Sequence, residues 1–186
     1  PKQAYLIQGL LLVTIGLITK YSGLQLALML GAESIVLLFL GQTRKNAILQ
    51  GAAYVAAALA MGWAMDGLQH FDRPSLYMGI GLGGMMVANM VLAGRQADAR
   101  QIVSPGPSYF SGLALLIWFL VTWHNSSPTW FPVVLGLECL ALSMSVYLLR
   151  RQELALFAQL FLLVGQVYWM FHSIHPGQQT AWWPPL

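Results

Sequence analysis

Seven long apolar segments, separated by short polar connections, constrain this chain more than any other feature. Each holds close to the ~20 predominantly apolar residues that a helix needs to cross a bilayer. They are Ala4–Thr19, Gly23–Gly41, Asn46–Met65, Ser75–Gly94, Pro107–His124, Trp130–Leu149 and Glu153–His172. The longest connection, 95–106, leaves no room for a domain outside the membrane. The sequence therefore predicts an all-α fold, a polytopic transmembrane helical bundle of about seven spans, as one domain over residues 1–186.

The scarcity of charge excludes several classes of protein. Asp, Glu, Lys and Arg make up 8% of the residues, against about 25% in soluble domains. The net charge of +3 comes from basic residues scattered through the connections, which is typical of an oriented membrane protein and not of a nucleic-acid-binding one. The single cysteine, Cys139, has no partner for an intrachain disulfide. A soluble enzyme, a nucleic-acid-binding module and a disulfide-stapled domain are all excluded.

The basic residues predict the orientation of the chain in the membrane. With the N-terminus in the cytoplasm, seven basic residues lie inside: Lys2, Arg44, Lys45, Arg95, Arg100, Arg150 and Arg151. Only Lys20 and Arg73 then lie outside. Short cytoplasmic loops are enriched in Lys and Arg, so we expect a cytoplasmic N-terminus and a periplasmic C-terminus.

Self-comparison reveals an internal repeat. Gln8-Gly9-Leu10 recurs as Ser111-Gly112-Leu113, Leu30-Gly31-Ala32-Glu33 as Leu135-Gly136-Leu137-Glu138, and Arg44-Lys45 as Arg150-Arg151. The offsets are 103, 105 and 106 residues. They predict a repeat A over 4–65, a linking span over 75–94 and a repeat B over 107–172. Because the copies are an even number of helices apart, we expect a parallel repeat about an axis along the membrane normal. An eighth span would complete the second copy, and the chain also begins without methionine, which favours a fragment or a reduced member of a larger family.

A family resemblance rests on residues 30–54 and 135–165, where a helix with a central glutamate precedes a basic turn and an Ala- or Leu-rich helix. This pattern resembles large bacterial inner-membrane proteins that are built from many such helices in tandem and catalogued only as a domain of unknown function. The resemblance implies a bacterial inner-membrane location and a repeat architecture. It implies no activity.

Glu33 and Glu138 lie near the centres of their segments, at equivalent points of the repeat. A carboxyl group at this depth is costly, so such residues usually face the bundle interior and have a partner. One hypothesis is a proton relay or a substrate-binding pair. The other is structural, because a protonated carboxyl can tie two helices together with a hydrogen bond. No basic residue in any segment supplies a counter-ion, and this favours the structural interpretation.

Other polar and small residues indicate helix packing. Gln152, Gln159, Gln166 and Ser173 recur every seven residues, and Asn89 adds a polar group to the fourth segment. They suit hydrogen bonds between helices better than the lining of a hydrated path. Gly79, Gly81 and Gly84 formally satisfy GxGxxG, but the strand that a dinucleotide site requires is missing. Small residues that allow close helix approach are instead predicted at Gly79 and Gly83 and at Ala52, Ala56 and Ala60.

The predicted outer face gathers His70, His124, His172 and His175. Imidazoles can bind zinc or relay protons, but no HExxH and no paired cysteines accompany them. The sequence therefore predicts neither a metal nor a cofactor, and no enzyme. The favoured function is a non-catalytic scaffold or accessory subunit whose partners are the lipid bilayer, other membrane subunits or further repeats. The alternative is a small transporter or proton-coupled channel that uses Glu33 and Glu138.

Overall fold

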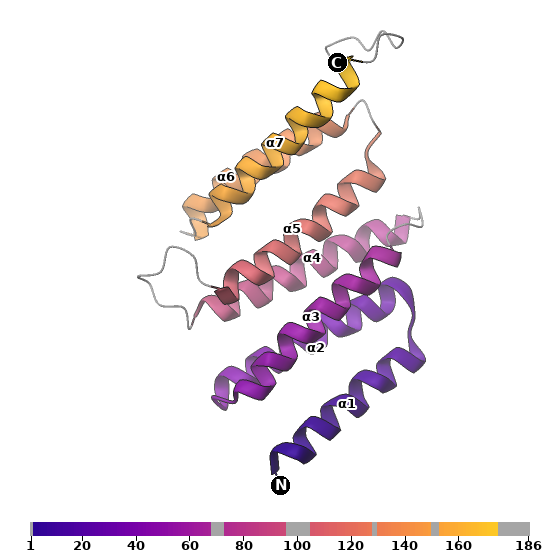
Figure 1. The fold of residues 1–186 in the computed structure, drawn as a ribbon, viewed down its shortest axis with the longest axis vertical. Helices are drawn as coiled ribbons and strands as arrows, with labels where there is room; N and C mark the ends of the chain where they lie inside the picture. Colours follow the sequence, from indigo (N-terminus) through magenta and orange to yellow (C-terminus); the bar gives the residue numbers. More distant parts are fainter. Residues whose placement is uncertain (1, 68–72, 96–104, 128–129, 150–152, 175–186) are drawn as a thin grey trace. The chain divides into compact units, whose positions relative to one another are not determined.

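The computed structural model describes residues 2–67, 73–95, 105–127, 130–149 and 153–174. Within these ranges the chain forms seven α-helices and no strand. They are α1 (Lys2–Lys20), α2 (Gly23–Thr43), α3 (Ala47–Gly67), α4 (Arg73–Gly94), α5 (Pro105–Asn125), α6 (Phe131–Leu149) and α7 (Glu153–Ile174). Figure 1 shows their order along the chain. The predicted all-α fold class is confirmed for the described residues, and every predicted segment ends within two residues of a helix boundary.

Five of the helices are long and apolar enough to cross a membrane, namely α2, α3, α5 and the stretches Leu76–Gly94 of α4 and Leu154–Phe171 of α7. Among the described residues, α1 and α6 contribute shorter apolar stretches, Gln8–Lys20 and Phe131–Ser145. The structure therefore supports a membrane protein with five candidate spans. The count of seven stays a prediction.

Proline positions explain where several helices begin. Pro74 is the second residue of α4, Pro105 the first of α5 and Pro132 the second of α6. Proline has no N–H to donate, but the first turn of a helix has no acceptor for one, so the residue is tolerated there and not in the interior. No further proline follows in α4 or α6, and the second proline of α5, Pro107, also lies in the first turn of its helix.

The chain divides into two compact units, 1–121 and 122–186, and each is described by itself. The centre of the first unit is the α2–α3 hairpin, whose helices lie side by side (Figure 1). The face of α3 toward the core is made of alanines with no exposed surface, Ala53, Ala57, Ala60 and Ala64. Small side chains allow two helix backbones to approach closely where lipid provides no hydrophobic driving force.

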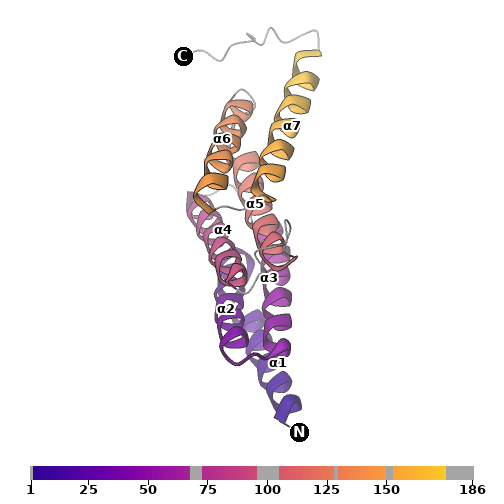
Figure 2. The same cartoon turned by 90° about the vertical axis from the view of Figure 1, so that its left-hand side faces the viewer.

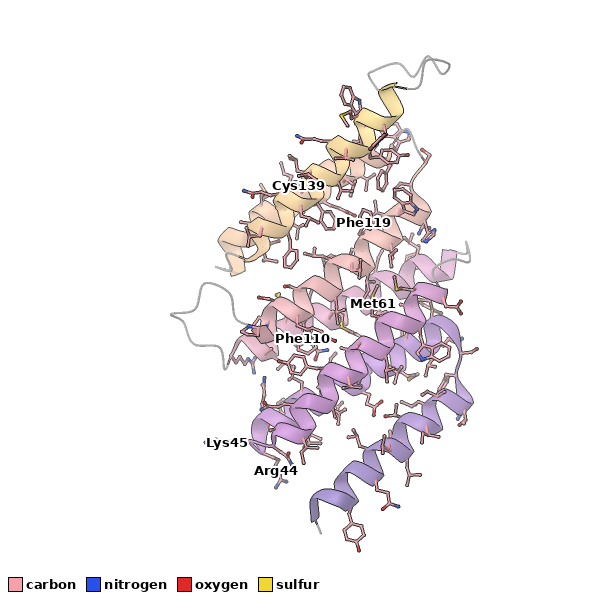
Figure 3. All side chains as sticks on the ribbon, in the orientation of Figure 1. Arg44, Lys45, Met61, Phe110, Phe119 and Cys139 are labelled. Atoms are coloured by element: carbon pink, nitrogen blue, oxygen red, sulfur yellow. The ribbon has the colours of Figure 1, made fainter. Side chains whose placement is uncertain are left out.

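Glycines close this hairpin at both ends. A Cβ atom on Gly41 would lie 2.8 Å from the backbone nitrogen of Gln50, and one on Gly67 would lie 2.8 Å from that of Leu24. Between the helices, Lys45 adopts a positive φ of 49° and Asn46 accepts a hydrogen bond from the backbone N–H of Ile48 at 3.0 Å. Arg44 and Lys45 lie at this turn (Figure 3). A side-chain oxygen of this kind satisfies one of the free N–H groups at a helix start.

Helix α4 covers one side of α2. A Cβ atom on Gly31 would lie 2.8 Å from Cδ1 of Leu82 and 3.2 Å from the sulfur of Met85. Near the ends of both helices, the Gln42 side chain donates to the carbonyl oxygen of Leu92 at 2.9 Å. Contacts that advance along both helices together show that α4 runs parallel to α2.

Helix α5 completes the first unit through an aromatic cluster with α3. The ring of Phe110 stacks on that of Tyr54, with centroids 4.9 Å apart, and the hydroxyl of Tyr109 donates to the carbonyl oxygen of Tyr54 at 2.9 Å. Phe110, which Figure 3 labels, is fully buried. Because apolar faces do not drive association in lipid, these specific contacts help to fix the position of α5.

The second unit is built on the α6–α7 hairpin, whose helices also lie side by side (Figure 2). Its described buried residues are Phe131, Leu135, Cys139 and Leu142 of α6 and Leu154, Ala158 and Phe161 of α7. The rings of Trp123, Phe131 and Tyr168 meet edge to face, with centroids 4.7–5.8 Å apart. Much of the remaining surface of both helices is exposed and apolar.

Candidate functional site

Glu33 lies near the middle of α2 and is half-buried against α1. The hydroxyl of Thr14 lies 3.1 Å from its Oε1 and 3.2 Å from the carbonyl oxygen of Leu10. A threonine hydroxyl has one proton and can also accept. Its single proton is therefore shared between the carboxyl oxygen of Glu33 and the carbonyl oxygen of Leu10 in its own helix.

Glu138 occupies the corresponding place in the second unit. The hydroxyl of Thr122, a buried residue near the end of α5, donates to Oε1 of Glu138 in α6. In both glutamates the other carboxyl oxygen, Oε2, is buried and has no hydrogen-bond partner among the described residues. Each glutamate is therefore held by one threonine from the preceding helix.

A second polar contact in the first unit joins three helices. Asn89 of α4 donates from its side-chain amide to the hydroxyl of Ser34 at 3.0 Å, and Ser34 donates to the carbonyl oxygen of Ala53 in α3 at 2.9 Å. Both polar side chains are completely buried. The sequence indicated Asn89 as a residue for hydrogen bonds between helices, and its side chain bonds Ser34, the residue that follows Glu33.

The second unit contains a similar contact that joins two helices instead of three. The thiol of Cys139, the residue that follows Glu138, donates to the carbonyl oxygen of Ala158 in α7 at 3.2 Å. Cys139 lies between α6 and α7 (Figure 3). Ser34 and Ala53 are 19 residues apart, as are Cys139 and Ala158. A thiol is a weaker donor than a hydroxyl, so the same position holds a weaker bond in the second hairpin.

The predicted packing residues lie in different environments. Gly83 is buried, and a Cβ atom there would come 2.1 Å from the indole nitrogen of Trp118, so only glycine fits beside this ring. Gly79 is buried as well. On α3, Ala56 and Ala60 are buried and Ala52 is half-buried. The most deeply buried alanine face is the one described above, which shares Ala60 with the predicted set.

Two residues of the predicted polar stripe, Gln159 and Gln166, lie on the described part of α7. The side chains of Gln159 and Gln166 are exposed, and the structure shows no hydrogen bond from either among the residues it describes. An exposed amide on an apolar helix is costly in lipid unless water, headgroups or another chain satisfies it. Gln152 and the side chain of Ser173 lie outside the described residues.

The histidines are only partly described. His124, at the end of α5, is half-buried and engaged by neighbouring groups. His70, His175 and the side chain of His172 lie outside the described residues. Among the residues that are described, no group of three His, Cys, Asp or Glu side chains comes together to hold a metal ion.

The sequence did not identify Thr14, Thr122, Ser34 and Cys139 as functional partners, although one signal was present. A small polar residue follows each glutamate of the repeat, as Ser34 and Cys139. The threonines carried no such signal, because they do not lie at equivalent positions of the repeat. Thr14 is 19 residues from Glu33, whereas Thr122 is 16 residues from Glu138.

Comparison with protein families, with curated proteins and with solved structures finds no match to this chain. Function therefore has to be inferred from the described contacts. Taken together, those contacts hold helices to one another and do not assemble a nucleophile, a base and an oxyanion site.

Proposed function

We propose that this protein is a non-catalytic, repeat-built subunit of a larger bacterial inner-membrane assembly. One observation carries the proposal: polar side chains that are buried or, at Thr14, half-buried each bond a group on another helix, namely Thr14, Ser34, Asn89, Thr122 and Cys139. Hydrogen bonds of this kind stabilise helix association in membranes by about 1 kcal/mol each. Polar groups used in this way build a rigid bundle, which is what a scaffold requires.

The match between the two hairpins supports the repeat and the family resemblance. At an offset of 105 residues, every described buried position of α6 and α7 coincides with a buried position of α2 and α3. The pairs, first hairpin first, are Leu26 and Phe131, Leu30 and Leu135, Ser34 and Cys139, Leu37 and Leu142, Leu49 and Leu154, Ala53 and Ala158, and Ala56 and Phe161. The match includes the bonds to Ala53 and Ala158. We infer that the two hairpins are copies of one ancestral unit.

A second candidate function is proton transfer through the glutamates. The observation that favours it is the buried, unpartnered Oε2 atom of Glu33 and of Glu138. A carboxyl group in the membrane interior with spare hydrogen-bonding capacity is typical of proton relays. Against this alternative, no buried base or cation accompanies either glutamate among the described residues.

Purification in a mild detergent and reconstitution into liposomes separate the two functions. A scaffold should co-purify with a defined set of partner subunits from its native membrane. Liposomes that contain the purified protein should then show no more proton flux than liposomes without protein. Proton flux that disappears in the Glu33→Gln and Glu138→Gln variants, with expression unchanged, would overturn the proposal in favour of the transporter.

The proposed orientation places the N-terminus in the cytoplasm and the C-terminus in the periplasm. Reporter fusions within residues 44–46 and 95–106 should report a cytoplasmic location, and fusions after His175 should report a periplasmic one, because the basic residues lie mostly on one side of the predicted spans. A cytoplasmic C-terminus would show that either the orientation or the count of seven spans is wrong.

A further inference from the structure

Three basic side chains lie at one end of the first unit, at the α2–α3 turn and just beyond α4. They are Arg44, Lys45 and Arg95, and all three are exposed. The side-chain amide of Gln42 donates to the carbonyl oxygen of Leu92 at 2.9 Å and ties the ends of α2 and α4 together. The basic residues follow the two bonded residues by two or three positions along the chain, so the bond holds them at the same end of the unit. We call Arg44, Lys45 and Arg95 the basic patch (Figure 3 labels the first two).

No described carboxylate of the first unit neutralises the basic patch. Glu33 lies near the middle of α2, and Asp66 lies at the opposite end of α3. None of the three basic side chains forms an ion pair within the part of the chain that the structure describes. The connection 96–104 contains Asp98 but also Arg100, so its sequence adds no net charge. The patch therefore keeps the full charge of its three cations.

The helix dipoles do not neutralise the basic patch either. A helix terminus carries about half an elementary charge, positive at the N-terminus and negative at the C-terminus. Helices α2 and α4 end at the patch, and α3 begins there. Helix α5 begins there too, because a Cβ atom on Gly106 would lie 3.6 Å from the Cβ atom of Ala93, near the end of α4. Two negative and two positive termini offset one another, so the side-chain charge decides the potential at this end.

The depth of the basic patch indicates which anion it meets. Both α2 and α4 contain candidate membrane spans, and their last large apolar residues are Leu40 and Leu92. Arg44 follows Leu40 by four residues, and Arg95 follows Leu92 by three. At about 1.5 Å per residue, the two arginines lie about 5–6 Å beyond the apolar part of each helix. The polar layer on each side of the hydrocarbon core is about 5–8 Å thick. Lipid phosphates are the anions present at that depth.

We propose that the basic patch is a binding site for the headgroup of an anionic phospholipid. The guanidinium groups of Arg44 and Arg95 present paired N–H donors that match the geometry of phosphate oxygens, and the ammonium of Lys45 adds a third positive charge. A zwitterionic headgroup brings its own cation and leaves the charge of the patch uncompensated, whereas an anionic headgroup compensates it. The site uses residues of the first unit alone. It goes beyond the proposed function, because a scaffold and a transporter would bind the lipid in the same way.

The opposite end of the first unit supplies a matched control. Lys20, the last residue of α1, is also an exposed cation. Its ammonium group lies 5.7 Å from the centroid of the Tyr21 ring. At this end the sequence balances its basic and acidic residues, with Lys20 and Arg73 against Asp66 and Asp72. An anionic headgroup therefore gains little from binding there, although the cation is exposed in the same way.

Native mass spectrometry of the purified protein in a neutral detergent tests the proposal, with phosphatidylglycerol as the probe and phosphatidylcholine as the comparison lipid. One basic residue near an anionic surface adds about fivefold to the affinity. The double variant Arg44→Gln/Arg95→Gln should therefore bind phosphatidylglycerol about 25-fold more weakly, whereas Lys20→Gln should change the affinity by less than about twofold. Equal losses in the two variants would overturn the proposal. So would the absence of any preference of the original protein for phosphatidylglycerol over phosphatidylcholine.

A variant that conserves charge separates lipid binding from folding. Arg44→Lys/Arg95→Lys keeps both cations and should retain the affinity for phosphatidylglycerol within about threefold. Lys45 stays unchanged in every variant because its backbone has a positive φ of 49°. The circular dichroism spectra should match, since the substituted side chains are exposed. If the double glutamine variant misfolds, the single variants Arg44→Gln and Arg95→Gln replace it, each with an expected loss of about fivefold.

Two further outcomes would contradict the proposal. A loss in the double lysine variant as large as in the double glutamine variant would show that the charge of the patch is not what the lipid recognises. Displacement of phosphatidylglycerol by an equal concentration of inorganic phosphate would show that the patch is a site for soluble anions. We expect neither, because the lipid is held by its phosphate at the depth where the patch lies.

Discussion

The α2–α3 and α6–α7 hairpins bury side chains at matching positions but differ in what lies against them. The first is covered by α4, which adds the Asn89–Ser34 bond and the close contact at Gly31. In the second unit, described by itself, the equivalent glycine of α6, Gly136, is exposed. The contact between two adjacent helices is therefore reproduced in both hairpins, and within the two described units the contact with a third helix of this kind is seen in the first.

The difference between Ser34 and Cys139 follows the same division. A hydroxyl accepts one hydrogen bond and donates another, which the three-helix contact of Ser34 requires. A thiol does both weakly, and Cys139 makes one described bond to Ala158. The stronger group is present where three helices meet, and the weaker one where two helices meet.

The largest expected effect is the difference in the free energy of unfolding between the Gly31→Leu and Gly136→Leu variants. Gly31→Leu should destabilise the protein by about 3 kcal/mol, because even a Cβ atom there meets Leu82 and Met85. Gly136→Leu should change the free energy of unfolding by less than about 1 kcal/mol, because its side chain enters open space. Reversible unfolding in mixed micelles measures both. Equal losses would show that Gly136 is packed as closely as Gly31.

A smaller difference is expected for the polar residues behind the glutamates. Ser34→Ala should cost about 2 kcal/mol, since it leaves the buried amide of Asn89 without its acceptor. Cys139→Ala should cost about 0.5 kcal/mol, because only a weak thiol bond is lost. The same unfolding assay compares them. A larger loss for Cys139→Ala than for Ser34→Ala would contradict the contrast between the two hairpins.

The threonine bonds should behave alike in both units. Thr14→Val and Thr122→Val each remove the hydroxyl that meets a glutamate, and each should destabilise by about 1 kcal/mol. Thermal unfolding followed by circular dichroism provides the measurement. If one variant keeps its full stability and the other loses much more than about 1 kcal/mol, the two contacts are not equivalent.

The smallest effect is expected for the amide variants. Glu33→Gln and Glu138→Gln retain the side-chain shape and a donor, so the free energy of unfolding should change by less than about 0.5 kcal/mol. Glu33→Leu and Glu138→Leu remove the bond and should cost about 1 kcal/mol each. Unfolding of the four variants side by side tests whether these carboxyl groups are structural. A severe loss in the amide variants would show that the carboxyl itself is required.

Much of the fold was predictable from the sequence, whereas most of the site was not. Helix positions follow from apolar length and from prolines such as Pro132, because both act within a single segment. Glu33 and Glu138 were recognisable because a carboxyl group is conspicuous inside an apolar run. Thr14 and Thr122 were not, because a threonine is common in such helices and its partner lies on another one.

By itself, the sequence determined an all-α chain of long apolar helices, their approximate ends and the residues that need a partner. The tertiary structure decided which faces are covered, that Asn89 bonds Ser34 and not a glutamate, and that Gly31 is packed while Gly136 is exposed. The physical reason is that lipid tails are as apolar as leucine, so hydrophobicity does not distinguish a helix face that meets protein from one that meets lipid. Only shape and hydrogen bonding between helices make that distinction, and both depend on residues far apart in the chain.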